Sequence, residues 1–367
     1  MNADKKKYFK LFANCIPVKG IKRSIICDLQ KGTVRYIPNE IEEILLKTNN
    51  NISIFDIKKS YNNKQDKGID LFFNELEKFG LGFYSNDVEG FVNLSEEWDY
   101  PGEISNAIID IVRKSNHPFK EIVKELDHLN CSNVQLRFFE NFNFSEISTI
   151  LDYFNNSGVR SIQLIILYNK DNTYENWNGL FKKFTRINSF LIYNSPFEEV
   201  ISKDQIIIEN IKSNIIDHRN CGNITTNYFT VNILTFMESK IFNSCLNKKI
   251  SIDSNGNIKN CPSMDKSYGN LKNTTLKQAL EKQGLKKLWT IKKDDIAICK
   301  DCEFRHICTD CRAYIENPND IYSKPLKCGY NPYTTKWEEW STNPLKSKAI
   351  EYYAMQELID GIMLSSK

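Results

Sequence analysis

The 367-residue sequence lacks the short motifs that mark several common enzyme classes. It contains no G-x-x-x-x-G-K-[ST] phosphate loop, and no glycine-rich dinucleotide fingerprint follows a strand-like run. Its four histidines are scattered and form no H-E-x-x-H zinc motif. These absences argue against a P-loop nucleotide hydrolase, a Rossmann-type dinucleotide enzyme and a zincin-type protease.

A strong charge bias and a long apolar run are also missing. The 49 Lys and Arg residues nearly balance the 46 Asp and Glu residues, which argues against a dedicated nucleic-acid surface. No apolar stretch reaches the length of a membrane span, and residues 1–7 lack the apolar run of a signal peptide. We therefore expect no nucleic-acid or membrane partner, and a cytoplasmic location in which thiols stay reduced.

Cysteine, in contrast, is concentrated in one region, because seven of the eleven lie between residues 245 and 328. The run C-K-D-C-E-F-R-H-I-C-T-D-C contains two C-x2-C pairs, and each pair can present two thiolates to one metal centre. Thiolates select zinc or iron–sulfur clusters over hard cations. The predicted metal ligands are Cys245, Cys261, Cys299, Cys302, Cys308, Cys311 and Cys328.

In the N-terminal part, apolar and polar residues alternate over residues 8–38, as in β-strands. Helical patterns follow over 39–46, 54–61 and 68–79, and Asn39 is the expected N-cap of the first. Three strands followed by three short helices describe a winged helix-turn-helix. The last helical pattern carries more acidic than basic groups, the reverse of what a major-groove reader needs. The arrangement resembles the element that captures leader peptides in peptide natural-product pathways, where the leader adds as a strand to a sheet edge. A domain that only packs on the rest of the chain is the alternative.

The middle of the chain alternates strand-like and helix-like runs, which predicts an α/β fold with a parallel sheet, open or curled toward a barrel. Such a fold hosts many chemistries and does not fix a function. The predicted strands are 106–112, 134–139, 161–168, 189–193 and 228–235, and the predicted helices are 119–129 and 144–154.

The cysteine-rich region begins with I-S-I-D-S-N-G-N-I-K-N-C-P, which predicts a β-hairpin turning at Asn255-Gly256 in a type I′ turn. This hairpin would return the chain so that Cys261 lies near Cys245. A helix is expected over residues 275–291. In the tail, Ile350, Ala354, Leu358 and Ile362 have helical spacing and predict a helix that packs on the body or docks a partner.

At its cysteines the chain resembles the SPASM domain of radical SAM peptide-modifying enzymes. Gly256-x4-Cys261 and the spacing of Cys299, Cys302 and Cys308 match that pattern, whereas Cys311 closes the run one residue early. The resemblance implies two [4Fe–4S] clusters. Carried over by position, one set of ligands is Cys299, Cys302, Cys308 and Cys328, and the other is Cys245, Cys261 and Cys311, with Cys221 as the nearest candidate for an upstream fourth ligand.

The radical SAM part of that resemblance is incomplete. Such enzymes need C-x3-C-x2-C after the first barrel strand, but the loop here reads R-K-S-N-H-P and contains no cysteine. Where the family has Gly-Gly-Glu, this chain reads R-F-F-E-N, so that only Glu140 remains. We therefore do not expect S-adenosylmethionine as a cofactor or any radical SAM activity.

This combination resembles the SPASM-domain peptide maturases of grasp-with-spasm systems. The resemblance implies a leader-binding domain (residues 1–98), a degenerate radical-SAM-type partial β/α barrel (99–240), a SPASM iron–sulfur domain (241–335) and a C-terminal helix (336–367). It also implies a precursor peptide and an ATP-grasp ligase as partners in peptide maturation. Two alternatives stay open: a redox maturase that uses its clusters directly, and a zinc-binding adaptor without catalysis.

Overall fold

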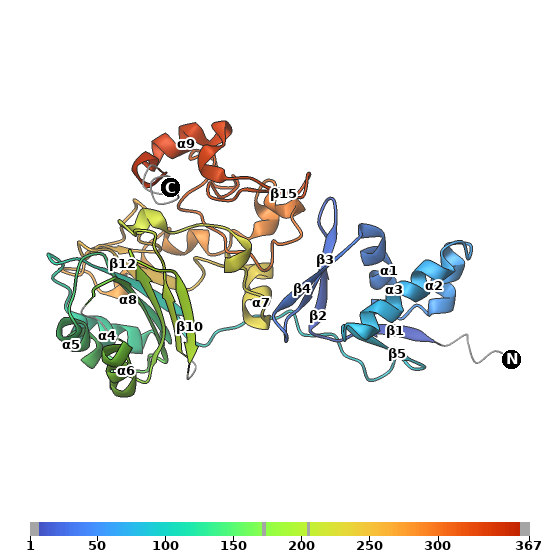
Figure 1. Cartoon of the computed structure of the whole chain (residues 1–367), viewed down its shortest axis with the longest axis horizontal. Helices are drawn as coiled ribbons and strands as arrows, with labels where there is room; N and C mark the ends of the chain where they lie inside the picture. The colour runs from blue at the N-terminus through green and yellow to red at the C-terminus, as the bar shows by residue number, and fades with distance from the viewer. Residues whose placement is uncertain (1–6, 171–173, 204–205, 360–367) are drawn as a thin grey trace.

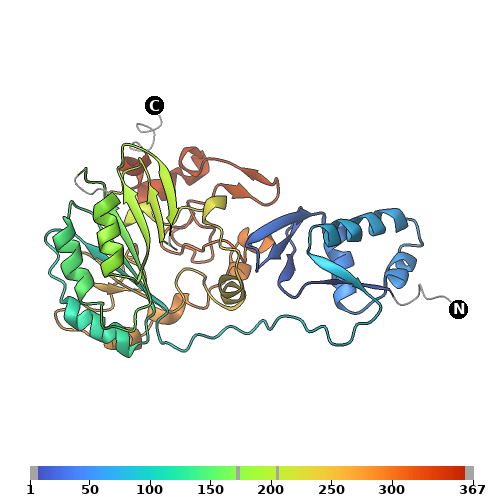
Figure 2. The same cartoon turned by 60° about the horizontal axis from the view of Figure 1, so that its bottom comes forward.

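The computed structural model describes residues 7–170, 174–203 and 206–359. An N-terminal domain lies at one end of the molecule and a larger α/β body at the other (Figure 1). Residues 86–105 form no helix or strand and run between the two parts as a long connection (Figure 2). No helix in the described ranges is long and apolar enough to cross a membrane.

The N-terminal domain packs three helices against an antiparallel sheet of order β2-β3-β4. Strand β3 is buried at every position, because Ile26 faces the helices while Ile25 and Cys27 face the cysteine-rich region. A second small sheet pairs β1 with β5. The elements are β1 (Tyr8–Leu11), β2 (Cys15–Val18), β3 (Ser24–Asp28), β4 (Thr33–Ile37), α1 (Asn39–Asn49), α2 (Ile54–Ser60), α3 (Asp66–Lys78) and β5 (Gly82–Ser85).

The predicted capping role of Asn39 is wrong. Pro38 is the N-cap residue of α1, and Asn39 already lies within the helix. The Asn39 side chain instead accepts a hydrogen bond from the Ser24 hydroxyl at 2.7 Å and donates to the carbonyl of Gly20 at 3.1 Å. Asn39 therefore fixes the helix to the β2–β3 turn.

The body is built on an eight-stranded sheet of order β10-β11-β9-β8-β7-β6-β12-β13. Its inner pairings are parallel, and the edge strands β10 and β13 are antiparallel to their neighbours. The prediction of a parallel sheet is confirmed, and the sheet is open in the described part of the chain. Its elements are β6 (Asn106–Ile111), α4 (Phe119–His128), β7 (Asn133–Phe138), α5 (Phe144–Asp152), β8 (Ser161–Leu167), α6 (Tyr174–Lys183), β9 (Ile187–Tyr193), β10 (Glu199–Lys203), β11 (Ile206–Asn210), β12 (Lys249–Ile252) and β13 (Ile258–Lys259).

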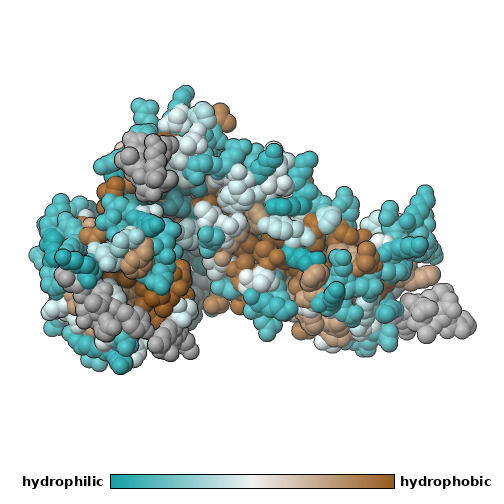
Figure 3. Space-filling model, in the orientation of Figure 1, coloured by the Kyte–Doolittle hydropathy of each residue, from teal (hydrophilic) through white to brown (hydrophobic). Residues whose placement is uncertain are grey.

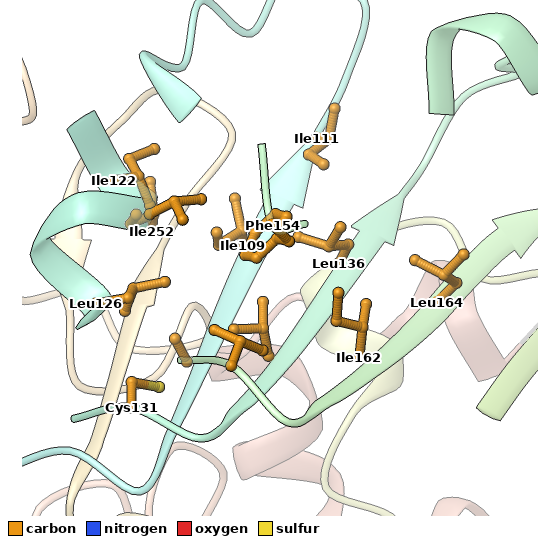
Figure 4. Packing of buried hydrophobic residues seen from close by; sticks show 14 of the residues in the cluster. Ile109, Ile111, Ile122, Leu126, Cys131, Leu136, Phe154, Ile162, Leu164 and Ile252 are labelled. Carbon is orange, nitrogen blue, oxygen red and sulfur yellow. The ribbon is translucent and has the colours of Figure 1, made fainter. Parts of the chain in front are cut away.

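The two faces of this sheet differ in chemistry. Alternate residues such as Leu136 and Leu164 are fully buried against α4, α5 and α6, and Figure 4 shows them packing with Phe154. The alternating residues of these strands point to the opposite face of the sheet, where Gln135 Nε2 donates to Gln163 Oε1 at 2.6 Å. The apolar face forms the main core, and the polar face is left for the cysteine-rich region.

Two predictions for the middle segment are corrected. Residues 228–235 do not form a strand; they contain the end of a 3-10 turn (Thr226–Tyr228) and the start of α7 (Ile233–Ile241), which Asn232 caps by accepting from the backbone N–H of Thr235. The hairpin of β10 and β11 was not predicted. Its strands are short and carry charged residues, so no clear alternation marks them.

The hairpin at Asn255-Gly256 is present as β12 and β13, but its turn is not type I′. Gly256 alone of the two central residues has a positive φ, 81°, and the Asp253 carboxylate accepts the backbone N–H groups of Asn255 and Asn257. Strand β12 also pairs with β6. The cysteine-rich region therefore completes the sheet of the preceding segment.

The helix expected over residues 275–291 is interrupted. Helix α8 (Leu276–Glu281) ends before Gly284, which adopts a φ of 98° and starts a separate 3-10 turn, Leu285–Leu288. A left-handed glycine stops a helix in this way.

The tail is not one long helix over 336–367. It contains β15 (Lys336–Trp337), which pairs with β14 (Tyr330–Asn331), and then α9 (Ser347–Tyr352), which is followed by Ala354 at a φ of 49°. Leu358 is buried against the body, whereas Ile362 lies outside the described residues.

The N-terminal domain contacts the body through the β2–β3 turn. The backbone N–H of Ile21 donates to the carbonyl of Asp301 at 2.8 Å, and Arg23 pairs with the buried Glu303 at 2.7 Å. Tyr330 donates to the same Glu303 carboxylate. Figure 3 shows hydrophobic surface in the middle of the molecule, where the domain and the body of Figure 1 meet.

Candidate metal centres

The first group of cysteines is Cys299, Cys302, Cys308 and Cys328. Cys302 is half-buried and the other three are buried. Burial raises the pKa of the Cys299 thiol to about 12, and the nearby Cys328 and Cys308 thiols add to this rise. Cys302 likewise interacts with Cys308 and Cys299. Cys302, Cys308 and Cys328 also belong to one packed cluster of side chains, and Cys299 is near enough to Cys308 and Cys328 to interact with them.

The second group is Cys245, Cys261 and Cys311, and Cys221 lies with them. Burial raises the pKa of Cys261 to about 11, with further rises from Cys221 and Cys245. The pKa of Cys311 is raised by burial and then by the same three cysteines. Cys221 is exposed at the rim of this group.

Gly222 gives independent evidence for the place of Cys221. Its φ is 85°, and a Cβ atom at this position would lie 2.9 Å from Sγ of Cys311. Only glycine allows such an approach in this left-handed conformation. The next residues hold the segment in place, because the backbone N–H of Ile224 donates to the carbonyl of Lys327 and Lys327 Nζ donates to the carbonyl of Cys221 at 2.9 Å.

Each group has one lysine against its sulfur atoms. Lys293 is buried and donates to Sγ of Cys308 at 3.3 Å. Lys249 of β12 is half-buried and donates to Sγ of Cys245 at 3.4 Å. Neither lysine was singled out from the sequence, because an isolated lysine carries no spacing signal.

A cavity of about 350 Å³ lies on the polar face of the sheet and reaches Lys249. Asn106, Gln135, Gln163 and Ser189 line it from neighbouring strands, and Gln163 donates to the Ser189 hydroxyl at 3.3 Å. Neutral amides and hydroxyls of this kind match the donors and acceptors of a peptide backbone. The cavity therefore has a polar lining that ends at Lys249, whose ammonium contacts Cys245.

A buried ion pair lies on the same face, nearer the ends of β6 and β7. Arg137 Nε lies 2.6 Å from Asp110 Oδ1 and Nη2 lies 2.8 Å from Oδ2, a bidentate pair. The Arg137 guanidinium also interacts with Cys221 and Cys261. The Arg137–Asp110 pair therefore lies close to the second group.

Both groups offer donor sets made only of cysteine sulfur. In the described part of the chain, no group of three or more His, Cys, Asp or Glu side chains is arranged as a ready site for a single metal ion. A zinc site needs all four sulfurs about 2.3 Å from one ion, whereas a [4Fe–4S] cluster spreads its cysteines over four irons. With four thiolates, either occupant carries a net negative charge, and the adjacent lysines fit such a charge.

The loop where radical SAM enzymes carry three cysteines has a different arrangement here. The backbone N–H of Arg113 donates to the Glu140 carboxylate, and the Arg113 guanidinium bonds Glu146 and the carbonyl of Asn141. The same guanidinium lies 4.3 Å from the centre of the Phe142 ring. Arg113 thus joins this loop directly to the segment that follows β7.

We expect Arg137→Met to destabilise the protein by about 3–5 kcal/mol, because it leaves the Asp110 carboxylate buried without its partner. Lys183→Met is the matched control, since Lys183 pairs with Asp152 at 3.0 Å where both side chains are about half exposed, and it should cost no more than about 1 kcal/mol. Urea unfolding measures both changes. Equal losses in the two variants would contradict the importance of the buried pair.

Comparisons with known proteins identify one part of the chain. Residues 244–303 match the SPASM family, described as an iron–sulfur cluster-binding domain. No curated protein matches the chain. SuiB from Streptococcus suis, solved bound to S-adenosylmethionine, is similar at 10% identity with a TM-score of 0.30, over 88% of this chain and 98% of that chain. The chain thus carries a SPASM-type iron–sulfur cluster-binding segment that starts just before Cys245 and extends through Cys302.

Proposed function

We propose that the protein acts in the maturation of a ribosomally synthesised peptide, as an iron–sulfur protein that binds the leader of the precursor. The observation that carries this proposal is the pair of four-cysteine groups beside a small domain with an open sheet edge. The SPASM match over residues 244–303 supports the iron–sulfur assignment.

Two [4Fe–4S] clusters are the proposed cofactors. Bound clusters would cross-link the segments that supply their thiolates and could store one electron each. The chain's own residues bury the sulfur atoms and place a lysine beside each group. The proposed ligands are Cys299, Cys302, Cys308 and Cys328 in the first site and Cys221, Cys245, Cys261 and Cys311 in the second.

The N-terminal domain is the proposed leader-binding element, of winged-helix type. Strand β4 pairs only with β3 in the described part of the chain, so its other edge is available to a peptide strand. Tyr36 on β4 and Phe79 after α3 are each about half exposed, and Arg35 lies 3.5 Å from the centre of the Phe79 ring. These side chains would contact the side chains of a peptide bound at the open edge.

This edge also lies next to the first cysteine group. The Tyr36 ring packs edge-on against Phe304 with centroids 6.1 Å apart, and Arg23 stacks on Tyr36 at 4.0 Å. Phe304 lies between Cys302 and Cys308 in the chain. A leader on β4 would therefore hold the rest of the precursor close to the body.

The body is proposed to be a degenerate radical SAM partial barrel without SAM chemistry. The segment from Val112 to Pro118 contains no cysteine, and Arg113 engages Glu140. Three thiolates are needed to leave one iron of a cluster free for S-adenosylmethionine. ATP chemistry would come from an ATP-grasp ligase partner, since no phosphate-loop motif occurs in the sequence.

We expect Cys302→Ser to lose about half of the bound iron and sulfide and to lower the thermal stability, because metal binding contributes directly to the folding free energy of such sites. Cys131→Ser is the matched control, since Cys131 is buried and its thiol donates to the carbonyl of Asn133 at 3.3 Å. Iron and sulfide analysis of anaerobically purified protein measures the effect. Unchanged iron in Cys302→Ser would contradict the first site.

We expect Tyr36→Ala and Phe79→Ala each to weaken leader binding by about tenfold or more, as loss of an aromatic anchor does at an interface. The probe is a set of fluorescein-labelled synthetic leader peptides, with affinity read by anisotropy. Leu71→Ala is the control, because Leu71 is 63% exposed and lies on α3, outside the β4 edge. A leader that binds all variants equally would contradict the assigned edge.

We expect no 5′-deoxyadenosine when the anaerobically purified protein is incubated with S-adenosylmethionine and dithionite. The reason is the missing three-cysteine loop at residues 112–118. Product analysis by liquid chromatography measures this. Formation of 5′-deoxyadenosine above a protein-free control would overturn the claim that radical chemistry is lost.

A further inference from the structure

Lys293 is a buried ammonium group, and among residues 7–170, 174–203 and 206–359 no carboxylate forms an ion pair with it, although Asp310 is near enough to interact. Lys293 is 3% exposed, and its hydrogen bond within the described residues goes to Sγ of Cys308. The acidic groups nearby are engaged elsewhere: Asp310 pairs with Arg312 at 2.8 Å and Asp294 with Arg305 at 2.9 Å. The remaining candidates for its counter-ion are the sulfur atoms of the first group.

Lys249 repeats this arrangement at the second group. Its ammonium donates to Sγ of Cys245 at 3.4 Å. The nearest acid on the same hairpin, Asp253, pairs instead with Lys259 at 3.1 Å, and the carboxyl of Glu238 on α7, which also interacts with Lys249, accepts a hydrogen bond from Asn247 at 2.8 Å. Lys249 lies on strand β12 and Lys293 begins a 3-10 turn, so the two contacts arise from unrelated local structures.

A buried ammonium is strongly unfavourable unless an anion lies beside it. A neutral thiol does not provide that charge, whereas four thiolates around an iron–sulfur core leave a net negative charge. The two lysines therefore indicate that both cysteine groups are built for an anionic occupant. The same charge that stabilises the occupant also acts on its redox chemistry.

We propose that Lys293 and Lys249 are the counter-charges of the two cysteine sites and that each raises the reduction potential of the cluster beside it. Reduction adds one electron and one negative charge to the cluster, so a fixed ammonium favours the reduced form. This inference rests on the proposed clusters. It makes the lysines positioning residues, which touch the ligand sulfurs and no substrate.

The test compares Lys293→Met and Lys249→Met with matched controls. Lys292→Met removes the same charge one residue away, where Lys292 bonds the carbonyl of Lys240. Lys266→Met is the control for Lys249→Met, because it removes a lysine charge from an exposed position after Cys261. Each protein is purified anaerobically, analysed for iron and sulfide, and titrated with dithionite while electron paramagnetic resonance follows the reduced clusters.

At the potential where the wild-type cluster is half reduced, we expect Lys293→Met and Lys249→Met each to show a reduced-to-oxidised ratio of the neighbouring cluster that is lower by about tenfold or more. This corresponds to about 59 mV for a one-electron couple. The two control variants should match the wild type. Each lysine should shift only the signal of its own cluster, with iron and sulfide contents unchanged.

Two failures are distinguishable. Wild-type protein without iron and sulfide would overturn the proposed function itself, whereas wild-type clusters with unchanged potentials in both variants would overturn only this inference. If Lys293→Met or Lys249→Met holds no cluster, Lys293→Arg and Lys249→Arg replace them in the test. Arginine keeps the positive charge of the lysine but not its shape. Clusters near the wild-type potential in the arginine variants support the inference, and their loss there would contradict it.

Discussion

Burial of charge beside sulfur is the constraint on which the arrangement of this protein depends. Eight cysteines lie in two groups, and positive side chains enter the structure around them. Lys293 and Lys249 contact the sulfurs, and Arg137, paired to Asp110, lies beside the second group. Such charges are stable inside a protein only if an anion shares the site. The anionic clusters proposed here would meet that condition, and the fold then holds the cysteines, their lysines and the sheet as one unit.

The same groups connect the two ends of the molecule. The cysteine-rich region meets the N-terminal domain through Glu303 and Phe304, which contact Arg23 and Tyr36. On its other side it completes the large sheet through β12 and lies over the polar face of that sheet. The cysteine-rich region therefore contacts both the N-terminal domain and the large sheet.

Local pattern explains what was predictable from the sequence. The parallel sheet followed from alternating βα runs, and most of its strands and helices lie where they were predicted. Short elements were missed, since β10 and β11 lack a clean alternation. Residues 228–235 read like a strand, although they contain the end of a 3-10 turn and the start of α7. Cysteine spacing marked seven candidate ligands. The proximity of Cys221 to Cys311 depends on the left-handed conformation of Gly222. The contacts of Lys249 and Lys293 with sulfur depend on tertiary packing. The spacing of residues in the sequence does not reveal these contacts.

The central claim is that two four-cysteine groups each hold an iron–sulfur cluster. It is tested most directly by measuring iron, acid-labile sulfide and zinc in the anaerobically purified wild-type chain, together with its absorption spectrum. Two [4Fe–4S] clusters predict about eight irons and about eight sulfides per chain. Zinc without sulfide, or iron sufficient for one cluster only, would contradict the account.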